Sequence, residues 1–324
     1  KGLRVQKTIA VIGSNSFSGA WFVKTALEEG YGVIGISRSP EPGDVFLPYK
    51  WHDLSGFQFH CFDLNHDLDA IEDLLEETKP NCIVNFAAQS MVGQSWKIPE
   101  HWYTTNVLSS VLLIERLRKM PFLERYIHIS TPEVYGSCQG DIKEHANYAP
   151  STPYAVSRAS FDMHLMAVHK AYGFPVLYTR AANVFGPGQQ LYRIVPKAAL
   201  SFLKGDILPL HGGGTSVRSF IHIEDVCRAT MEIVDKGEPG QIFHISTKQM
   251  ISIKDLVAKV ADHLGVDFSN AVQITGDRLG KDAAYLLDSE KVRSLGWKEM
   301  HTLDQGIAQT VEWVKEHFDY LKYM

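Results

Sequence analysis

Tyr154 and Arg158 stand four residues apart on a predicted helix, so they share one face of it. A cation beside a phenol lowers the pKa of the phenol, which would let Tyr154 act as a general base. A buried tyrosine in an ordinary cation pair has the same spacing, and the pair alone favours that plainer interpretation. Thr131 and Glu133 follow the end of a predicted strand and add a hydroxyl and a carboxylate to the candidates.

A glycine-containing turn lies between the first predicted strand and the first predicted helix. Gly13 and Gly19 occupy two of the three glycine positions typical of a dinucleotide-binding turn, and Ser16 occupies the middle one. Glycine lets the backbone approach a pyrophosphate, and the helix N-terminus adds positive potential. The position at the first strand–helix junction therefore predicts a cofactor site that includes Gly13, Ser16, Phe17 and Gly19.

The residues after the next two strands bear on the identity of the cofactor. An acidic residue after the second strand is typical of sites for NAD, and an arginine there is typical of sites for NADP. Ser37 and Arg38 take this place and predict NADP, with NAD as the alternative, although a merely solvated Arg38 fits the same sequence. Asp63 and Leu64 follow the third strand and are candidates for the adenine edge; Asp63 could equally form a turn or cap a helix.

Apolar strands alternate with helices through the first half of the chain. Strands are predicted at residues 8–12, 32–36, 57–62, 82–86, 126–130 and 176–180, and helices at 20–28, 68–77, 103–119 and 151–172. This alternation predicts a parallel sheet covered on both faces, and right-handed crossovers make it a doubly wound, Rossmann-type α/β fold.

The pattern loosens after Val184, where turns and short strands separate helices at residues 194–204, 223–236, 253–264 and 303–318. We expect residues 1–185 to form an NAD(P)-binding domain that carries the catalytic residues. Residues 186–324 are expected to form a smaller α/β substrate-binding domain, part of which returns to the main sheet. The run Gly212–Gly214 lacks the Lys-Ser/Thr of a P-loop and is interpreted as a turn.

Composition excludes several classes of protein. The 324 residues have a formal net charge of −5, 45% are hydrophobic and 21% are charged, which is typical of a folded globular chain. The mild acidity argues against binding to nucleic acid or to a membrane surface. Neither a transmembrane segment nor a signal peptide is predicted, so we expect a cytoplasmic protein. The cysteines lack CxxC spacing and the histidines lack an HExxH pattern, so no metal site is expected.

The ordered motifs resemble those of the extended short-chain dehydrogenase/reductase family, and within it the nucleotide-sugar 4,6-dehydratases and their epimerase and decarboxylase relatives. The resemblance covers nearly the whole chain. Besides the glycine turn, its motifs are NFAAQS at 85–90, ISTPEVYG at 129–136, STPYAVSR at 151–158, RAANVFGPG at 180–188, VRSFIHIEDV at 217–226 and DRLGKDAAY at 277–285. The GDP-mannose and dTDP-glucose 4,6-dehydratases are the most similar branches, and Ser37-Arg38 is similar to the NADP-using GDP-mannose branch.

The resemblance implies a role for each matching residue. Tyr154 matches the catalytic base, Thr131 the hydroxyl that orients the sugar C4 oxygen, and Glu133 the carboxylate that acts at C5. The stretch implied to line the cofactor is Phe86, Ala87 and Ala88. The residues implied to bind substrate are Gln89, Asn183, Arg193, Arg218 and Arg278.

Two positions depart from the family pattern. Arg158 replaces the usual lysine, which lowers the tyrosine pKa and binds the nicotinamide ribose; arginine keeps the charge but is bulkier and has a different donor geometry. Pro132 stands where the dTDP-glucose enzymes place an aspartate that protonates the leaving hydroxyl. Proline cannot donate a proton, so either Glu133 serves as both base and acid or another group or water assists. The GDP-mannose branch also lacks this aspartate.

The resemblance implies a 4,6-dehydratase that makes a nucleotide-linked 4-keto-6-deoxy sugar through a 4-keto intermediate, with tightly bound NAD(P). A 4-epimerase would not need Glu133 at C5, and a decarboxylase of nucleotide-linked uronic acids would use the same Thr-x-Glu set. A non-catalytic NADP-binding sensor would have no need of Thr131, Glu133 and Tyr154 together. The resemblance also implies a homodimer paired through the helices at residues 103–119 and 151–172.

Overall fold

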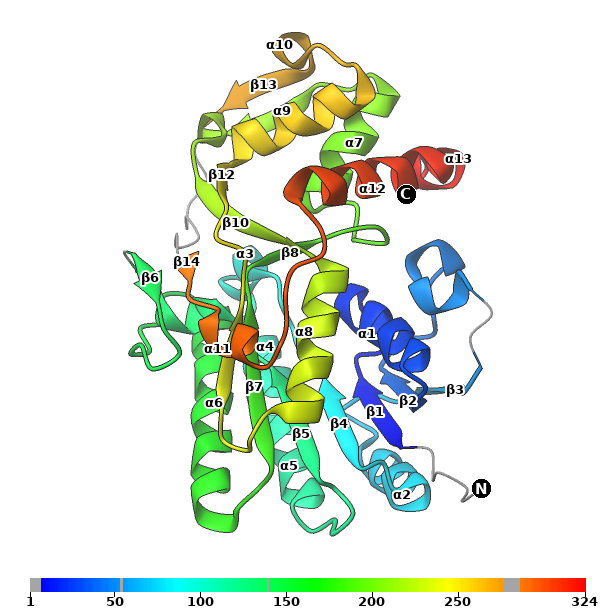
Figure 1. The fold of residues 1–324 in the computed structure, drawn as a ribbon, viewed down its shortest axis with the longest axis vertical. Helices are drawn as coiled ribbons and strands as arrows, with labels where there is room; N and C mark the ends of the chain where they lie inside the picture. The colour runs from blue at the N-terminus through cyan, green and yellow to red at the C-terminus, as the bar shows by residue number, and fades with distance from the viewer. Residues whose placement is uncertain (1–6, 53–54, 139, 277–285) are drawn as a thin grey trace.

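The computed structural model describes residues 7–52, 55–138, 140–276 and 286–324. A seven-stranded sheet with the order β11-β7-β5-β4-β1-β2-β3 forms the centre of the lower part of Figure 1. Its strands all run parallel, which confirms the Rossmann-type fold. They are β1 (Thr8–Ile12), β2 (Gly32–Ser37), β3 (Phe57–Cys61), β4 (Cys82–Asn85), β5 (Arg125–Ile129), β7 (Val176–Ala181) and β11 (Ile242–Ile245).

Helices cover both faces of this sheet, and β1 shows why. Ile9 and Val11 belong to one core cluster, whereas Ala10 and Ile12 belong to another, because successive side chains on a strand point to opposite faces. The first cluster includes residues of α1 (Phe17–Glu28) and α8 (Ile223–Lys236). The second includes residues of α2 (Leu68–Thr78), α5 (Ser110–Leu117) and α6 (Pro153–Tyr172).

The helix that carries the predicted tyrosine begins at a well-defined residue. The Thr152 hydroxyl accepts a hydrogen bond from the backbone N–H of Ala155 at 3.1 Å, and Pro153 fills the first helical position. Gly173 ends α6 with a φ of +69°, which glycine adopts at little cost. These caps place Tyr154 in the first turn, beside the ends of the sheet strands.

The continuous helix expected at residues 103–119 is interrupted. The chain forms α4 (Pro99–Tyr103), a π-helical segment η3 (Thr104–Ser109), and then α5. The Ser110 hydroxyl donates to the carbonyl of Thr105, five residues earlier, at 2.9 Å. Amphipathic spacing predicts a helix here but does not reveal the wider turn, which places Asn106 in the interior.

The upper part of Figure 1 has its own core. A three-stranded sheet of β8 (Asn183–Phe185), β10 (Val217–His222) and β12 (Met250–Ser252) lies beneath three helices, α7 (Ile194–Lys204), α9 (Ile253–Leu264) and α12 (Leu303–Glu316). The part of the chain after Phe185 also returns to the lower part, where α8 packs on the main sheet and β11 pairs with β7. The division at residue 185 stays a prediction.

Shorter elements complete the described chain. The helices are α3 (Val92–Ser95), α10 (Phe268–Ala271), α11 (Glu290–Ser294) and α13 (Phe318–Leu321), with 3₁₀ turns η1 (Asp44–Phe46), η2 (Pro48–Lys50), η4 (Pro132–Tyr135) and η5 (Gly212–Gly214). The strand pairs are β6 (Asp141–Ile142) with β14 (Leu286–Leu287), and β9 (Leu208–His211) with β13 (Val272–Thr275).

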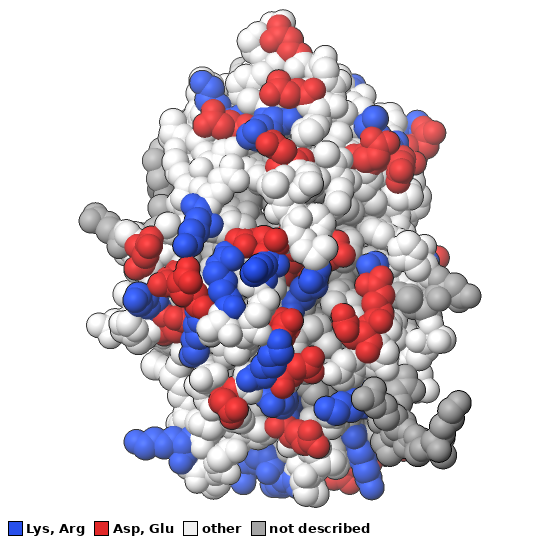
Figure 2. All heavy atoms as spheres, viewed as in Figure 1, with Lys and Arg blue, Asp and Glu red and all other residues white. Residues whose placement is uncertain are grey.

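Surface charge is mixed on the face seen in Figure 2, where Lys and Arg side chains are interspersed with Asp and Glu. Among the described residues, no helix combines the length and the apolar character needed to cross a bilayer.

Candidate active site

The turn between β1 and α1 requires glycine at two points. Gly13 has a φ of +85°, and a Cβ there would lie 2.9 Å from the backbone nitrogen of Ala87. A Cβ on Gly19 would meet the Gly13 carbonyl oxygen at 2.0 Å. The Ser16 hydroxyl donates to that carbonyl at 2.7 Å and accepts from the Gly19 N–H at 3.1 Å, so it caps α1. The Phe17 side chain packs in the core.

Hydrogen bonds from Asn15, a residue that sequence reasoning missed, link the end of β2 to this turn. Its backbone N–H donates to the buried Ser37 hydroxyl at 3.1 Å, and its side-chain amide donates to the Ser39 and Pro40 carbonyls at 2.9 and 3.1 Å. Arg38 is exposed at the same edge. The structure therefore brings Ser37 to the glycine turn and places Arg38 at the surface.

The predicted adenine residues have structural roles after β3. One Asp63 carboxylate oxygen accepts the backbone N–H of Asn65 at 2.8 Å, which is the turn-forming alternative. Leu64 is buried against the core between the sheet and its helices. A contact of either residue with adenine stays a prediction.

Phe86, Ala87 and Ala88 follow β4 and are half-buried, with the first two directly against Gly13. The next residue, Gln89, is held through its backbone by Asn106: its N–H donates to Oδ1 at 2.8 Å and its carbonyl accepts from Nδ2 at 3.0 Å.

Asn106 also donates to the Ser157 hydroxyl at 3.0 Å, and so ties η3 to the β4 loop and to α6. Sequence reasoning missed it, although an asparagine on the apolar face of a predicted helix was an available signal.

Tyr154 is the centre of the predicted catalytic group. Burial raises the pKa of its phenol, the positive charge of Arg158 lowers it, the negative charge of Glu133 raises it, and a hydrogen bond with the Thr131 side chain lowers it. The four residues predicted for catalysis therefore lie close enough to influence one phenol. The overall direction is upward: Arg158 lowers the pKa of Tyr154 as expected, but burial outweighs it.

Thr131 and Glu133 reach this position through a 3₁₀ turn. Thr131 precedes η4 as its cap, and its hydroxyl accepts the backbone N–H of Glu133 at 3.3 Å. The turn follows β5 directly, so the hydroxyl and the carboxylate emerge at the end of a central strand. The backbone N–H of Tyr154 donates a hydrogen bond to the Ser95 hydroxyl of α3 at 3.2 Å.

Arg158 points inward rather than to the surface. Its Nη2 donates to the carbonyl of Ile129 and lies 3.4 Å from Nε2 of His128. The side chain is buried, and its Nε has no hydrogen-bond partner among the described residues. The guanidinium thus rests against the end of β5, one helical turn from Tyr154.

A buried ion network lies one turn further along α6, centred on Asp162. Its carboxylate accepts from Arg180 at 2.7 Å, from the Ser130 hydroxyl at 2.8 and 2.9 Å and from Tyr148 at 3.1 Å, and lies 3.1 Å from Nε2 of His128. Burial alone would raise the pKa of Asp162, but the hydrogen bond from His128 and the charge of Arg180 hold it well below its usual range. Sequence reasoning missed this network; the spacing of Tyr154, Arg158 and Asp162 on one helix face was the available signal.

The predicted substrate residues occupy different surroundings. Half-buried Asn183 donates to the Ser219 carbonyl at 3.1 Å, between β8 and β10. Exposed Arg193 precedes α7, and its positive charge is among those that lower the pKa of Tyr154. The half-buried Arg218 side chain donates a hydrogen bond to the backbone carbonyl of Val217 at 2.9 Å. Arg278 lies outside the described residues.

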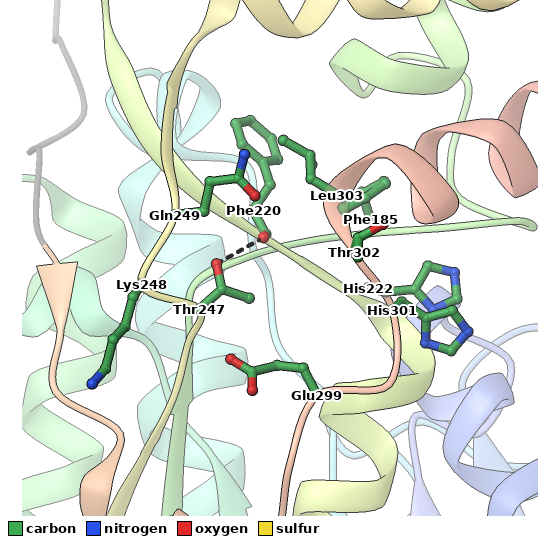
Figure 3. A pocket seen from close by; sticks show the side chains of 10 residues that line it. All are labelled: Phe185, Phe220, His222, Thr247, Lys248, Gln249, Glu299, His301, Thr302 and Leu303. Atoms are coloured by element: carbon green, nitrogen blue, oxygen red, sulfur yellow. Dashed lines mark hydrogen bonds between the residues drawn. The ribbon is translucent and has the colours of Figure 1, made fainter.

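A cavity of about 240 Å³ lies elsewhere, between β8, β10 and the loop before α12 (Figure 3). Its lining includes Phe185, Phe220, His222, Glu299 and His301, and none of the residues predicted for chemistry.

Sequence comparison identifies a matching family, relatives of similar length and much longer relatives. The profile of a family described as GDP-mannose 4,6 dehydratase matches residues 11–310. A dTDP-glucose 4,6-dehydratase of Xanthomonas campestris pv. campestris is 32% identical, over 94% of this chain and 92% of that protein. The chain spans only 38% of the length of a trifunctional UDP-glucose 4,6-dehydratase, 3,5-epimerase and reductase of Arabidopsis thaliana, to which it is 32% identical over 253 residues.

Solved structures show the same fold. The dTDP-glucose 4,6-dehydratase DesIV of Streptomyces venezuelae, with NAD and TYD bound, has a TM-score of 0.89 and 31% identity, over 97% of this chain and 98% of that one. A UDP-glucose 4-epimerase of Thermotoga maritima, with UDP-glucose, has a TM-score of 0.87 and 26% identity, over 96% and 99% of the two chains.

Proposed function

Because the chain belongs to the GDP-mannose 4,6-dehydratase family of nucleotide-sugar dehydratases and epimerases within the extended short-chain dehydrogenases, we propose that it is a nucleotide-sugar 4,6-dehydratase. The observation that carries the proposal is that the carboxylate of Glu133 lies close enough to Tyr154 for its charge to raise the pKa of the phenol. A 4-epimerase needs a base at C4 but no acid or base at C5. A carboxylate next to the tyrosine therefore favours removal of the C5 proton and loss of the C6 hydroxyl.

The glycine turn fits a dinucleotide, since it is a tight turn at the first strand–helix junction in which a Cβ at Gly13 or Gly19 would clash with the neighbouring backbone. In the proposal, Gly13, Ser16, Gly19 and the backbone N–H of Phe17 face the pyrophosphate, where the N-terminus of α1 adds positive potential. NAD(P) held there would supply the reversible hydride transfer that the reaction needs, from C4 of the sugar and back to C6.

The side chains of this chain then move the protons. Thr131 orients the C4 oxygen, and Tyr154 accepts the proton of the C4 hydroxyl as that carbon is oxidised. The C4 ketone acidifies the neighbouring C5–H bond, and Glu133 takes the C5 proton. The C6–oxygen bond breaks, and Glu133 returns the proton to the departing hydroxyl, which leaves as water. When hydride reaches C6, C5 takes up a proton from solvent, and Tyr154 releases the proton that it accepted from the C4 hydroxyl, so the site returns to its starting state. Pro132 cannot supply this proton, so the mechanism gives both tasks to Glu133.

The test is a panel of nucleotide sugars, including GDP-mannose, dTDP-glucose and UDP-glucose, incubated with the protein and NADP or NAD. We expect a 4-keto-6-deoxy product, detected by its alkaline absorbance and by mass. A product inverted at C4 with the C6 hydroxyl intact would identify an epimerase, and released carbon dioxide a decarboxylase. Tight cofactor binding with no product from any sugar would identify a sensor.

Replacing Arg158 with glutamine is expected to move the acidic limb of the kcat/KM profile to higher pH. The charge of Arg158 lowers the pKa of Tyr154, so its loss raises that pKa and leaves less phenolate at neutral pH. Below its pKa the phenolate fraction falls about tenfold for each pH unit. Arg158→Lys is the matched control, because it keeps the charge, and its limb should stay near that of the wild type. An unchanged limb in Arg158→Gln would remove Arg158 from the proposed catalytic group.

We also propose that the cofactor is NADP. The support is the exposed Arg38 beside Ser37, at the edge where an acidic residue would bind the ribose hydroxyls of NAD. Arg38→Ala should weaken NADP binding about tenfold, or about 1.4 kcal/mol, and leave NAD binding nearly unchanged. Arg228→Ala, an exposed arginine on α8, is the control. Equal effects on NADP and NAD in titration calorimetry would contradict the assignment.

A homodimer is proposed through η3, α5 and α6. The support is a set of exposed apolar side chains on these packed elements: Leu108, Leu112 and Met163, which are 57%, 46% and 53% exposed. A second copy of the chain would cover them. Leu112→Glu should convert the dimer to a monomer in analytical ultracentrifugation, whereas Met300→Glu, at an exposed methionine elsewhere, should not. A wild-type monomer would contradict the proposal.

A cytoplasmic location is proposed as well. Its support is that Cys61, Cys82, Cys138 and Cys227 are free thiols, as expected in a reducing compartment.

A further inference from the structure

Three potential metal ligands meet beside the cavity of Figure 3, away from the predicted catalytic group. His222 ends β10, Glu224 lies in the first turn of α8, and His301 lies in the loop before α12. Their ligand atoms all lie within 4.8 Å of one another. Figure 3 shows the rings of His222 and His301 side by side at the edge of the cavity.

His301 is oriented from behind by Asp225. Nδ1 of His301 lies 3.2 Å from Oδ2 of Asp225, while Nε2 lies 3.4 Å from Oε2 of Glu224. The Asp225 carboxylate is itself fixed, because it accepts the backbone N–H groups of Met300 at 2.8 Å and His301 at 3.1 Å. A carboxylate that binds one ring nitrogen and leaves the other for a metal is the usual support of a ligating histidine.

His222 contributes a nitrogen that lacks a partner. Its Nε2 is buried and makes no hydrogen bond with any described residue, and a buried polar atom left in this state costs free energy. A metal ion at Nε2 would give this nitrogen the partner that it lacks. Nδ1 accepts the backbone N–H of Glu224 only at the long distance of 3.4 Å, so metal binding through Nε2 would place the ring proton on Nδ1 at the expense of this weak contact.

We propose that His222, Glu224 and His301 bind a divalent transition-metal ion of the Zn²⁺ or Co²⁺ type, through two imidazole nitrogens and one carboxylate oxygen. This donor set suits such ions, and metal–ligand bonds of about 2.0–2.2 Å put neighbouring tetrahedral ligands about 3.3 Å apart. The 3.4 Å between Nε2 of His301 and Oε2 of Glu224 matches that spacing. His222 moves toward them on binding, and the cavity provides the entry path and room for a water ligand.

The ion would have a structural effect. It joins α8, which covers the main sheet, to the loop that leads into α12 of the upper part. Binding would therefore stabilise the arrangement of the two parts without contact with Tyr154 or Glu133. Because none of the proposed metal ligands belongs to the proposed catalytic group, the test of this site is independent of the proposed dehydratase activity.

The test titrates the metal-free chain of 324 residues with Co²⁺ and follows the visible d–d absorption, whose intensity reports four-coordinate Co²⁺. We expect binding at one equivalent per chain, displacement by Zn²⁺, and a rise in the unfolding midpoint with Zn²⁺. His301→Gln should abolish the absorption. Asp225→Asn, which weakens the support of His301, should reduce affinity about 10- to 100-fold. His101→Gln, at an exposed histidine on α4, is the matched control and should behave as wild type.

The alternative is that His301 only bridges Glu224 and Asp225 through its two ring nitrogens. In that case the wild type shows neither the Co²⁺ absorption nor a Zn²⁺-dependent rise in the unfolding midpoint, and the proposal fails. It also fails if His301→Gln and Glu224→Gln both bind Co²⁺ as tightly as the wild type. Should His301→Gln fold poorly, Glu224→Gln alone decides, because its partly exposed side chain is less needed for folding.

Discussion

Glu133→Gln is expected to lower the kcat for dehydration about 10²- to 10⁴-fold, the usual loss when a general acid or base is removed. Glutamine has nearly the same shape but cannot accept the C5 proton or return it to the C6 hydroxyl. The negative charge of Glu133 raises the pKa of Tyr154, so its removal favours the phenolate and should not slow oxidation at C4. The variant should therefore accumulate reduced cofactor with the 4-keto sugar.

Single-turnover measurements separate the two steps. The near-ultraviolet absorbance of the reduced cofactor should rise at a rate close to that of the wild type and then persist, while the 4-keto-6-deoxy product forms slowly. Glu100→Gln, at an exposed glutamate on α4, is the control and should keep full activity. A Glu133→Gln enzyme that released 4-keto-6-deoxy sugar at near wild-type rate would show that this carboxylate does not have the proposed role.

Asp162→Ala is expected to lower the free energy of unfolding by about 3–5 kcal/mol, which is the typical cost of breaking a buried ion pair from one side. Asp162 and Arg180 are both fully buried and 2.7 Å apart, so the substitution leaves the guanidinium in the interior without its counter-charge. It also removes the acceptor of the Ser130 hydroxyl, directly before Thr131. Urea denaturation at a fixed protein concentration measures the loss.

The matched control is Asp69→Ala, since Asp69 is 92% exposed and pairs with Arg116 on the surface. It should cost at most about 1 kcal/mol. A loss of that small size for Asp162→Ala would show that the buried network contributes little.

The difference between Asp162→Ala and the wild type should also depend on pH. The folded protein holds the pKa of Asp162 below the ordinary value of 3.8, so its contribution is present above that pH and is lost as the pH falls below it. The two unfolding free energies should therefore converge in acid.

Much of the fold could be predicted from local sequence patterns. The alternation of apolar strands and helices predicts the parallel sheet, and the bounds of β1, α7 and α9 agree with those expected because periodicity and caps act over a few residues. The glycine turn is equally local, since a positive φ and a close backbone approach require glycine at the position itself. The interruption at η3 escaped prediction, because the apolar spacing is nearly the same in both kinds of helix.

The sequence by itself determined the Rossmann-type fold, the family and the residues that could do chemistry. Only the tertiary structure decided what surrounds them: Arg158 meets the end of β5, Asp162 meets Arg180, and His301 meets Glu224. These pairs are distant along the chain, and their contact depends on strand order and on how helices pack. Burial is also a property of the folded whole, which is why a tyrosine beside a cation has a raised pKa rather than a lowered one.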